Sequence, residues 1–356
     1  MFPPRRLQEA SGPAQPSADA AVRSTDLDAL VSRASAHREG YLKDPFALLF
    51  LPPAQRRSGE KRPPLINIGT HARTWAVDEL VEQFLRREAG ECQVLSLGAG
   101  TDTRFWRLRK KWEEGRVRLG EWRCRRWVEV DFPEATSAKA KTVSGKTELK
   151  GALGSDVKIE LGGQGLTSSL YALLPGDLRM LDALTSLLLA PPPSNPSGPP
   201  ILDPSLPTLL LVECVLVYLE PDITQGLLSW FSETFDGAKG SAVVSYDPFG
   251  LEDSFGQVMK RNLAARNLLL PGAGSTPTLA SLVERLQAAG ASGECGSLSV
   301  KDIREGCVPR EEAERVAKIE QIDEVEELNL VLEHYAVTWG NLSIGEGGIG
   351  LKEREE

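Results

Sequence analysis

Two glycines that follow a short apolar run are the first residues of this chain with an evident chemical use. Val94, Leu95 and Leu97 form the run, and Gly98 and Gly100 come directly after it. Glycines at the carboxyl end of a buried strand permit a tight turn and let a nucleotide approach bare backbone. Threonine replaces the third glycine of the dinucleotide motif, which disfavours a pyrophosphate and favours a compact adenosyl ligand. A plain strand-to-helix turn would explain the same pattern.

Four carboxylates stand at or just beyond the ends of candidate strands, namely Asp131, Asp177, Glu213 and Asp247. Since the carboxyl ends of parallel strands share one edge of a sheet, we expect several of these acids to surround one pocket. Such a pocket repels phosphates, and it suits ribose hydroxyls, an adenine amino group and a cationic ligand. S-adenosylmethionine carries all three features and has no phosphate, so the acids favour it as the cofactor.

Asp131 has the most specific expected role among these acids. An acid at the end of the second strand of a nucleotide-binding sheet accepts hydrogen bonds from ribose hydroxyls, usually about 20 residues beyond the glycines. Asp131 lies further than that from Gly100, so the segment between them would contain an insertion. An ordinary surface aspartate is the alternative interpretation.

Cysteine and histidine usage argues against a metal or disulfide framework. The five cysteines are odd in number, none lies in a CxxC pair, and the chain has three histidines. We therefore expect no metal site and a reducing compartment. Cys214 beside Glu213 is a possible nucleophile in isolation, but a cysteine at a strand end is more often a packing residue.

Strands that alternate with helices are expected to position these residues, which predicts a doubly wound α/β sheet. Besides 94–97, we expect strands at 127–130, 171–174, 209–212, 241–246, 297–300 and 332–339. We expect helices capped at 24–26 and over 44–50, 76–85, 181–189, 221–235, 253–270, 278–289 and 311–328. Six prolines make 191–200 a loop.

A basic segment with interleaved tryptophans raises a second hypothesis. Ten Lys or Arg residues lie between Arg104 and Arg126, among Trp106, Trp112 and Trp122. Basic residues among aromatics can form a nucleic-acid surface, whereas a helix followed by a solvated loop is the simpler interpretation. The net charge of −9 supports the simpler one and makes nucleic acid an improbable partner.

Several segments together resemble the leucine carboxyl methyltransferases, over about residues 24–340. The resemblance rests on QVLSLGAGTDTRFWRL, VEVDFPE, GDLR, PTLLLVECVLVYLEP and HYAVTW. These S-adenosylmethionine enzymes methylate the C-terminal leucine carboxylate of the type 2A protein phosphatase catalytic subunit. The resemblance implies a class I methyltransferase fold, Rossmann-like and doubly wound, whose seven-stranded sheet ends in an antiparallel strand. The alternatives are a methyltransferase of the same core that acts on a tRNA base or a small carboxylic acid, and an inactive phosphatase-binding relative.

The family implies a role for each matching position. Gly98 and Gly100 would lie under the methionine part, Asp131 would hold the ribose, and Asp177 and Leu178 would flank the adenine. At the amino-acid end, Glu213 would approach the amino group of the cofactor, Arg73 would pair with its carboxylate and act in catalysis, and Tyr218 would border the methyl-transfer region. Arg33 is the nearest match to a basic residue that faces the cofactor. Ile68 stands where the family has an arginine, which puts a substrate contact from that position in doubt.

We expect a disordered segment over 1–22, a single methyltransferase domain over 23–340 and a flexible tail over 341–356. Within the domain, 23–90 would form a helical cap and 140–207 inserted loops and a lid. No run of 18 apolar residues and no secretion signal occurs, so we expect a cytoplasmic or nuclear protein without a membrane span. We further expect a monomer whose partner is the C-terminal tail of the phosphatase catalytic subunit.

Overall fold

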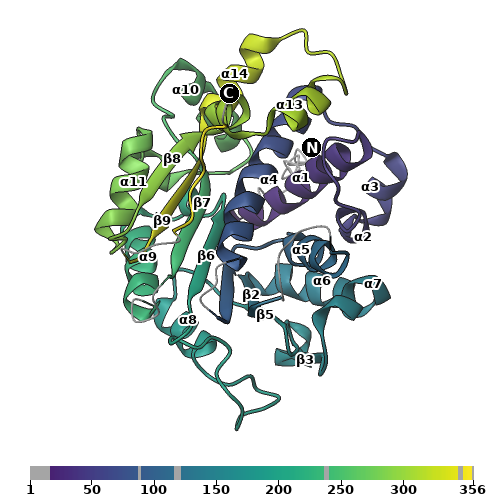
Figure 1. Cartoon of the computed structure of the whole chain (residues 1–356), viewed down its shortest axis with the longest axis vertical. Helices are drawn as coiled ribbons and strands as arrows, with labels where there is room; N and C mark the ends of the chain where they lie inside the picture. Colours follow the sequence, from purple (N-terminus) through teal and green to yellow (C-terminus); the bar gives the residue numbers. More distant parts are fainter. Residues whose placement is uncertain (1–16, 87–89, 116–121, 236–239, 344–347, 355–356) are drawn as a thin grey trace, which may run out of the picture.

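The computed structural model of the protein describes residues 17–86, 90–115, 122–235, 240–343 and 348–354. In this part of the chain, a nine-stranded sheet in the order β3-β4-β5-β2-β1-β6-β7-β9-β8 separates two layers of helices (Figure 1). The strands are β1 (Cys92–Leu97), β2 (Cys124–Asp131), β3 (Lys158–Glu160), β4 (Gly165–Thr167), β5 (Tyr171–Pro175), β6 (Thr208–Glu213), β7 (Ala242–Pro248), β8 (Cys295–Ser299) and β9 (Tyr335–Asn341).

The topology confirms the predicted fold class. Strands β5, β2, β1, β6 and β7 are parallel, and β9 runs antiparallel between β7 and β8. The hairpin of β3 and β4 pairs antiparallel with the outer edge of β5 and adds two strands to the predicted seven. Each of these two strands spans three residues, which is too short to leave a pattern in the sequence.

The central strand β1 packs against helices on both of its faces, because its side chains alternate between them. Val94 joins a core cluster with α1 (Ala18–Arg38) and α4 (Pro64–Leu85), whereas Leu95 and Leu97 join a cluster on the opposite face. Helices of the first layer include α2 (Ala47–Phe50), α5 (Arg104–Glu113), α6 (Pro133–Ser144) and α14 (Val325–Glu333), and those of the second are α8 (Leu181–Leu188), α9 (Pro221–Phe235) and α11 (Leu279–Ala288). Burial on both faces explains why these strands are continuously apolar.

Helix α1 begins earlier than the sequence predicted. It starts at Ala18, inside the segment 1–22 that was expected to be disordered, whose first sixteen residues lie outside the described part. Ser17 caps the helix by accepting from the backbone N–H of Ala20. The predicted cap residues Ser24 and Thr25 instead donate to carbonyls of the preceding turn at 2.6 and 2.7 Å. Their hydroxyls are thus compatible with a helix interior.

The start of the region 140–207, which was predicted as inserted loops and a lid, is more ordered than expected. Besides α6, it holds α7 (Thr147–Lys150), the hairpin of β3 and β4, and three-residue 3₁₀ turns at 151–153 and 161–163. Leu149, Leu153 and Leu166 are buried in the first core layer. Helix α3 (Pro53–Ser58) falls within the segment 23–90, which was predicted to form a helical cap. Residues 191–200 form no regular element, as predicted.

The predicted helix over 311–328 is wrong, because the chain forms two helices there. Helix α13 (Arg310–Ala317) ends before α14 begins at Val325. Between them, the carboxylate of Glu320 accepts from the hydroxyl of Tyr41 at 2.9 Å and pairs with the ammonium of Lys61 at 2.7 Å. These tertiary contacts accompany the break in the helix. The last strand likewise starts at Tyr335 rather than at residue 332, which belongs to α14.

The end of the chain also differs from its prediction as a flexible tail. Ile349 is 1% exposed, and its backbone exchanges hydrogen bonds with the side-chain amide of Asn341 at 2.9 and 3.1 Å. Gly350 donates to Gln83 on α4 at 2.9 Å. The described tail residues therefore pack on the domain, and only 344–347 and 355–356 of the tail lie outside the described part.

Candidate functional site

A cavity of about 260 Å³ lies at the carboxyl ends of β1, β2, β5 and β6, and residues of α1 and α4 complete its wall. The structure brings all nine predicted positions to this cavity, namely Arg33, Arg73, Gly98, Gly100, Asp131, Asp177, Leu178, Tyr218 and Glu213. Six carboxylates and four guanidiniums line it, which leaves a formal charge of −2. Of the four acids at strand ends, Asp247 alone is not among the described lining residues.

The glycine loop packs closely against neighbouring side chains. Gly98 and Gly100 have φ values of +64° and +44°, which side chains rarely tolerate. A Cβ at Gly98 would meet Val215 at 2.3 Å, and one at Gly100 would meet a carboxylate oxygen of Asp26 at 2.4 Å. The loop therefore requires glycine at both positions, and its backbone borders the cavity.

Asp131 is held rigidly at the end of β2. One carboxylate oxygen accepts from the backbone N–H of Gly100 and the other from that of Phe132, both at 2.7 Å. Burial raises the pKa of Asp131 above its ordinary value, although these two hydrogen bonds favour the ionised form. A fixed carboxylate beside a glycine loop is well placed to accept from hydroxyl groups.

Asp26 on α1 is a site residue that the sequence did not reveal. Its carboxylate accepts from both the backbone N–H and the hydroxyl of Thr101 at 2.7 Å. This contact attaches α1 to the glycine loop and closes one side of the cavity. Asp26 and Thr101 lie 75 positions apart, so no local pattern could have paired them.

The end of β6 carries a buried carboxylate between two guanidiniums. Glu213 accepts from Nε of Arg73 at 2.8 Å through one oxygen and from Arg104 at 2.7 Å through the other. Burial opposes ionisation of Glu213, but the guanidiniums of Arg104 and Arg73 together lower its pKa below the ordinary value. Arg73 also lies over the ring of Tyr246 at 4.3 Å from the centroid. Arg104 is a second residue that sequence reasoning missed.

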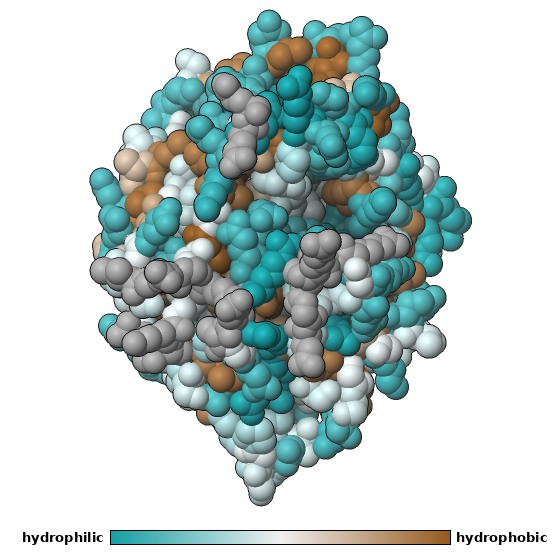
Figure 2. Space-filling model, viewed as in Figure 1, coloured by the Kyte–Doolittle hydropathy of each residue, from teal (hydrophilic) through white to brown (hydrophobic). Residues whose placement is uncertain are grey.

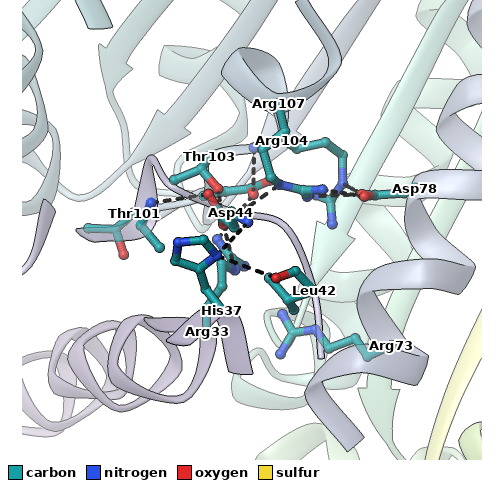
Figure 3. Close-up of polar contacts among 12 residues, drawn as sticks. Arg33, His37, Leu42, Asp44, Arg73, Asp78, Thr101, Thr103, Arg104 and Arg107 are labelled. Carbon is teal, nitrogen blue, oxygen red and sulfur yellow. Dashed lines mark hydrogen bonds and ion pairs between the residues drawn. The ribbon is translucent and has the colours of Figure 1, made fainter. Parts of the chain in front are cut away.

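Arg33 lines the cavity, and its charge is already partnered within the protein. Its guanidinium lies 3.3 Å from Asp102 and 3.8 Å from Asp44. Figure 3 shows Arg33 within a cluster of polar contacts that also includes Asp44 and Arg104. Ile68, which replaces the family arginine, is 3% exposed and packs in the core, so position 68 offers no polar group to a substrate here.

Asp177 occupies an exposed part of the cavity wall and is bound by Arg179. The guanidinium of Arg179 donates to both oxygens of Asp177 at 2.6–3.1 Å and to both oxygens of Asp19 at 3.0 Å. These hydrogen bonds from Arg179 lower the pKa of Asp177. The pair Arg179 and Asp19 was not anticipated, and it joins the first turn of α1 to the end of β5.

Cys214 and Tyr218 follow Glu213 along the cavity wall. Cys214 has φ of +54°, an uncommon value for a side chain that turns the backbone sharply after β6. Burial raises the pKa of its thiol to about 12, so it remains protonated and is a poor nucleophile. Burial also raises the pKa of Tyr218. Asp247 is 3% exposed and accepts from the backbone N–H of Val217 at 3.4 Å, so it supports this turn from behind.

The residues at the cavity fit S-adenosylmethionine. Asp131 suits the ribose, Leu178 offers an apolar surface to the adenine, and opposite charges at Glu213 and Arg73 suit an amino-acid zwitterion. In the described residues, no group of three or more histidine, cysteine or acidic side chains could hold a metal ion.

In the described part of the chain, none of the helices is both long and apolar enough to cross a membrane. On the face seen in Figure 2, hydrophobic residues form small patches separated by hydrophilic ones.

Comparison with known proteins identifies the family. A family model for leucine carboxyl methyltransferase matches residues 21–232. The chain is 42% identical to Leucine carboxyl methyltransferase 1 of Cryptococcus neoformans over 96% of this chain and 97% of that protein. The protein of the same name from Aspergillus fumigatus is 38% identical over 90% of this chain and 83% of the relative, and that from Bos taurus 34% over 94% and 93%. These matches confirm the resemblance seen in the motifs: the chain belongs to the leucine carboxyl methyltransferase family, whose members are S-adenosylmethionine-dependent enzymes.

Proposed function

We propose that this protein methylates the C-terminal leucine carboxylate of the type 2A protein phosphatase catalytic subunit and forms a methyl ester. One observation carries the proposal: all nine predicted positions line one cavity. Glu213 and Arg73, which form an ion pair, are among them. The matched relatives carry the name Leucine carboxyl methyltransferase 1, and the chain covers nearly the whole length of two of them.

The amino-acid end of the cofactor is assigned to Glu213 and Arg73. The carboxylate of Glu213 would accept from the cofactor's ammonium group, because each carboxylate offers about four acceptor sites and its two guanidinium contacts leave some of them. Nε of Arg73 serves Glu213, which leaves the two terminal nitrogens for the cofactor's carboxylate. Gly98 and Gly100 would lie under the same part.

The adenosyl end is assigned to the other wall. Asp131 would accept from the two ribose hydroxyls, and Leu178 would pack against the adenine. Asp177 would accept from the adenine amino group with a lone pair that Arg179 does not use. This last role is compatible with the ion pair, because Asp177 is only partly buried.

The reaction needs no general base in this proposal. The bound cofactor supplies an electrophilic methyl group, and the acceptor carboxylate is already ionised at neutral pH. The residues therefore act by placing one acceptor oxygen in line and by excluding water. Tyr218 keeps its proton because burial raises its pKa, so it can donate a hydrogen bond beside the methyl-transfer region. The protonated Cys214 takes no part.

The alternative functions receive less support from the structure. Trp106 and Trp127 in and next to the basic segment are fully buried in the core, so they are not available to stack on bases of a tRNA. An inactive relative has no need of a complete cavity, whereas every position expected to bind cofactor lines this one. We also propose that the protein acts as a monomer in the cytoplasm or nucleus.

Three acceptors compared in one assay test the proposal. Labelled methyl transfer is measured with the intact phosphatase catalytic subunit, with the same subunit lacking its last leucine, and with an isolated tail peptide. We expect transfer to the intact subunit and none to the truncated one. Equal transfer to the truncated subunit would refute the carboxylate assignment. We expect weaker transfer to the peptide, because ordering a free segment costs about 1 kcal/mol or more per residue.

A further inference from the structure

Arg104 lies directly behind the cavity wall, in contact with three carboxylates. Its Nε donates to Asp78 at 2.7 Å, and one terminal nitrogen donates to Asp102 at 2.6 Å and to Glu213 at 2.7 Å. The Arg104 side chain is 1% exposed, and the residue is not among the described ones that line the cavity. A guanidinium so placed acts on Glu213 and is shielded from a ligand in the cavity.

Arg104 belongs to a cluster in which buried charges balance. The cluster comprises Arg33, Arg73, Arg104 and Arg107 with Asp44, Asp78, Asp102 and Glu213. Figure 3 shows most of these side chains gathered between α1, α4 and the start of α5. The four positive and four negative charges of the cluster sum to zero. A zwitterionic ligand has no net charge, so its binding leaves this sum unchanged.

The planar fork of an arginine is required at this position. Arg104 spans carboxylates from α4, from the glycine loop and from β6, whereas the single ammonium of a lysine could not reach all three with the same geometry. The contacts to Asp78 and Asp102 hold the Arg104 guanidinium in place, and its third contact holds Glu213. Glu213 in turn restrains Arg73 through the 2.8 Å contact to Nε.

We propose that Arg104 is a positioning residue that fixes Glu213 in place and in its ionised form, so that Glu213 and Arg73 present a preorganised pair to the amino-acid part of the cofactor. The inference rests on the proposed assignment of Glu213 to the cofactor's ammonium group. It adds a residue to the site without giving it a contact to the cofactor.

Several charged groups that face Glu213 determine its pKa, and the test must take them into account. Arg104 on α5, Arg73 on α4 and the more distant Arg33 on α1 lower the pKa of Glu213, whereas burial and the charge of Asp102 raise it. Cys214 and Tyr246 also face this region and carry no charge at neutral pH, because burial raises the pKa of each. Because the charge of Arg104 lowers the pKa of Glu213 and burial raises it, removal of Arg104 should raise that pKa. A protonated Glu213 loses acceptor capacity toward an ammonium group, and cofactor affinity then falls as the pH is lowered.

The experiment measures S-adenosylmethionine affinity by calorimetry at pH 6 and pH 8 for the full chain. For each protein we take the ratio of the dissociation constant at pH 6 to that at pH 8. We expect this ratio to be at least tenfold larger for Arg104→Gln than for the wild type. Dividing by the wild-type ratio removes the titration of the cofactor's own groups. Arg107→Gln is the matched control: Arg107 is a neighbouring buried arginine that contacts Asp78 and Asp44, with no described contact to Glu213. It should lose thermal stability without gaining this pH dependence.

A purely structural role for Arg104 predicts a different result. If Arg104→Gln and Arg107→Gln show the same ratio of affinities at the two pH values, large or small, the proposal is overturned. The loss of affinity would then come from a general destabilisation of the buried cluster. Should Arg104→Gln fail to fold, Arg104→Lys retains the charge and loses the fork. We expect it to bind several-fold more weakly than wild type at both pH values, and wild-type affinity would overturn the proposal. Failure of the wild-type protein to bind the cofactor would instead refute the proposed function itself.

Discussion

Two arginines, Arg104 behind the cavity wall and Arg179 on it, each bridge carboxylates, yet their surroundings differ. Arg104 contacts Asp78, Asp102 and Glu213 with a side chain that is 1% exposed. Arg179 contacts Asp177 and Asp19 with all three side chains between 32% and 41% exposed. Exposed ion pairs contribute about 0–1 kcal/mol, whereas breaking a buried pair costs roughly 3–5 kcal/mol, because a charge is left without a partner. Ion pairs to arginine therefore hold the buried carboxylates around Glu213, at the deep end of the cavity, firmly in place. At the mouth of the cavity, around Asp177, exposed ion pairs hold the wall only loosely.

The largest expected effect follows from changing the buried acid. Glu213→Gln keeps the shape and removes the charge that two guanidiniums and the cofactor's ammonium group need. We expect S-adenosylmethionine affinity to fall about 100-fold, because hydrogen bonds to charged groups contribute roughly 1.5–3 kcal/mol each. Calorimetry measures it, and Glu220→Gln, at an exposed position, is the control. A change in cofactor affinity smaller than threefold would show that Glu213 does not bind the cofactor.

Asp247 tests what burial does to a strand-end acid that lacks a close cationic partner. Its Oδ2 lies 4.0 Å from Arg285, and neither that oxygen nor the facing nitrogen makes a hydrogen bond among the described residues. Burial raises the pKa of Asp247 to about 7. Since the folded-state pKa is raised above the unfolded value, its contribution to stability is present at low pH and is lost as the pH rises through about 7.

The Asp247→Asn variant isolates this titration. Relative to wild type, we expect its free energy of unfolding to increase by about 1–3 kcal/mol between pH 5 and pH 8. Urea unfolding at both pH values provides the measurement. A variant that is destabilised equally at pH 5 and pH 8 would show that Asp247 is a constantly ionised partner of Arg285.

Asp131 lies between the two extremes, since its described contacts are to backbone N–H groups. We expect Asp131→Ala to weaken cofactor binding about tenfold, because water replaces part of the lost hydrogen bonding to the ribose. Asp131→Asn retains one acceptor oxygen and should lose less. If calorimetry on a folded alanine variant gives unchanged affinity, Asp131 is not the ribose ligand.

The smallest effect is expected at the mouth. Arg179→Ala removes an exposed bridge and should change the free energy of unfolding by about 1 kcal/mol or less. Its effect on cofactor affinity should stay below threefold and shrink further at high salt, since exposed charges are screened. Thermal unfolding and calorimetry at two salt concentrations measure both. A loss comparable to that of Glu213→Gln would abolish the contrast between the two ends of the cavity.

The sequence predicted the parts of the site that lie at strand ends. Asp131 and Glu213 were found because each follows an apolar run, and parallel strands bring such ends together. Asp26 and Arg104 were missed because their partners lie 75 and 109 positions away, and no local spacing encodes such pairs. For the same reason, the sequence could not show that Asp177 is held by Arg179 and reaches Asp19 on α1.

The fold was predictable to a similar extent. Strands buried on both faces are continuously apolar and were recognised, as was the antiparallel last strand through the family resemblance. The break between α13 and α14 and the docked tail at Ile349 coincide with tertiary contacts to residues far away in the sequence or across a loop. Such contacts override local propensity and leave no periodic signal.

The position of the transferred methyl group tests the proposed function most directly. The protein is incubated with S-adenosylmethionine and the intact phosphatase catalytic subunit, and the C-terminal peptide of the subunit is then analysed by mass spectrometry before and after mild alkaline treatment. We expect one methyl group on the α-carboxylate of the last leucine, which alkali removes because it is held as an ester. A methyl group on any side chain, or one that survives alkali, would contradict the proposed function.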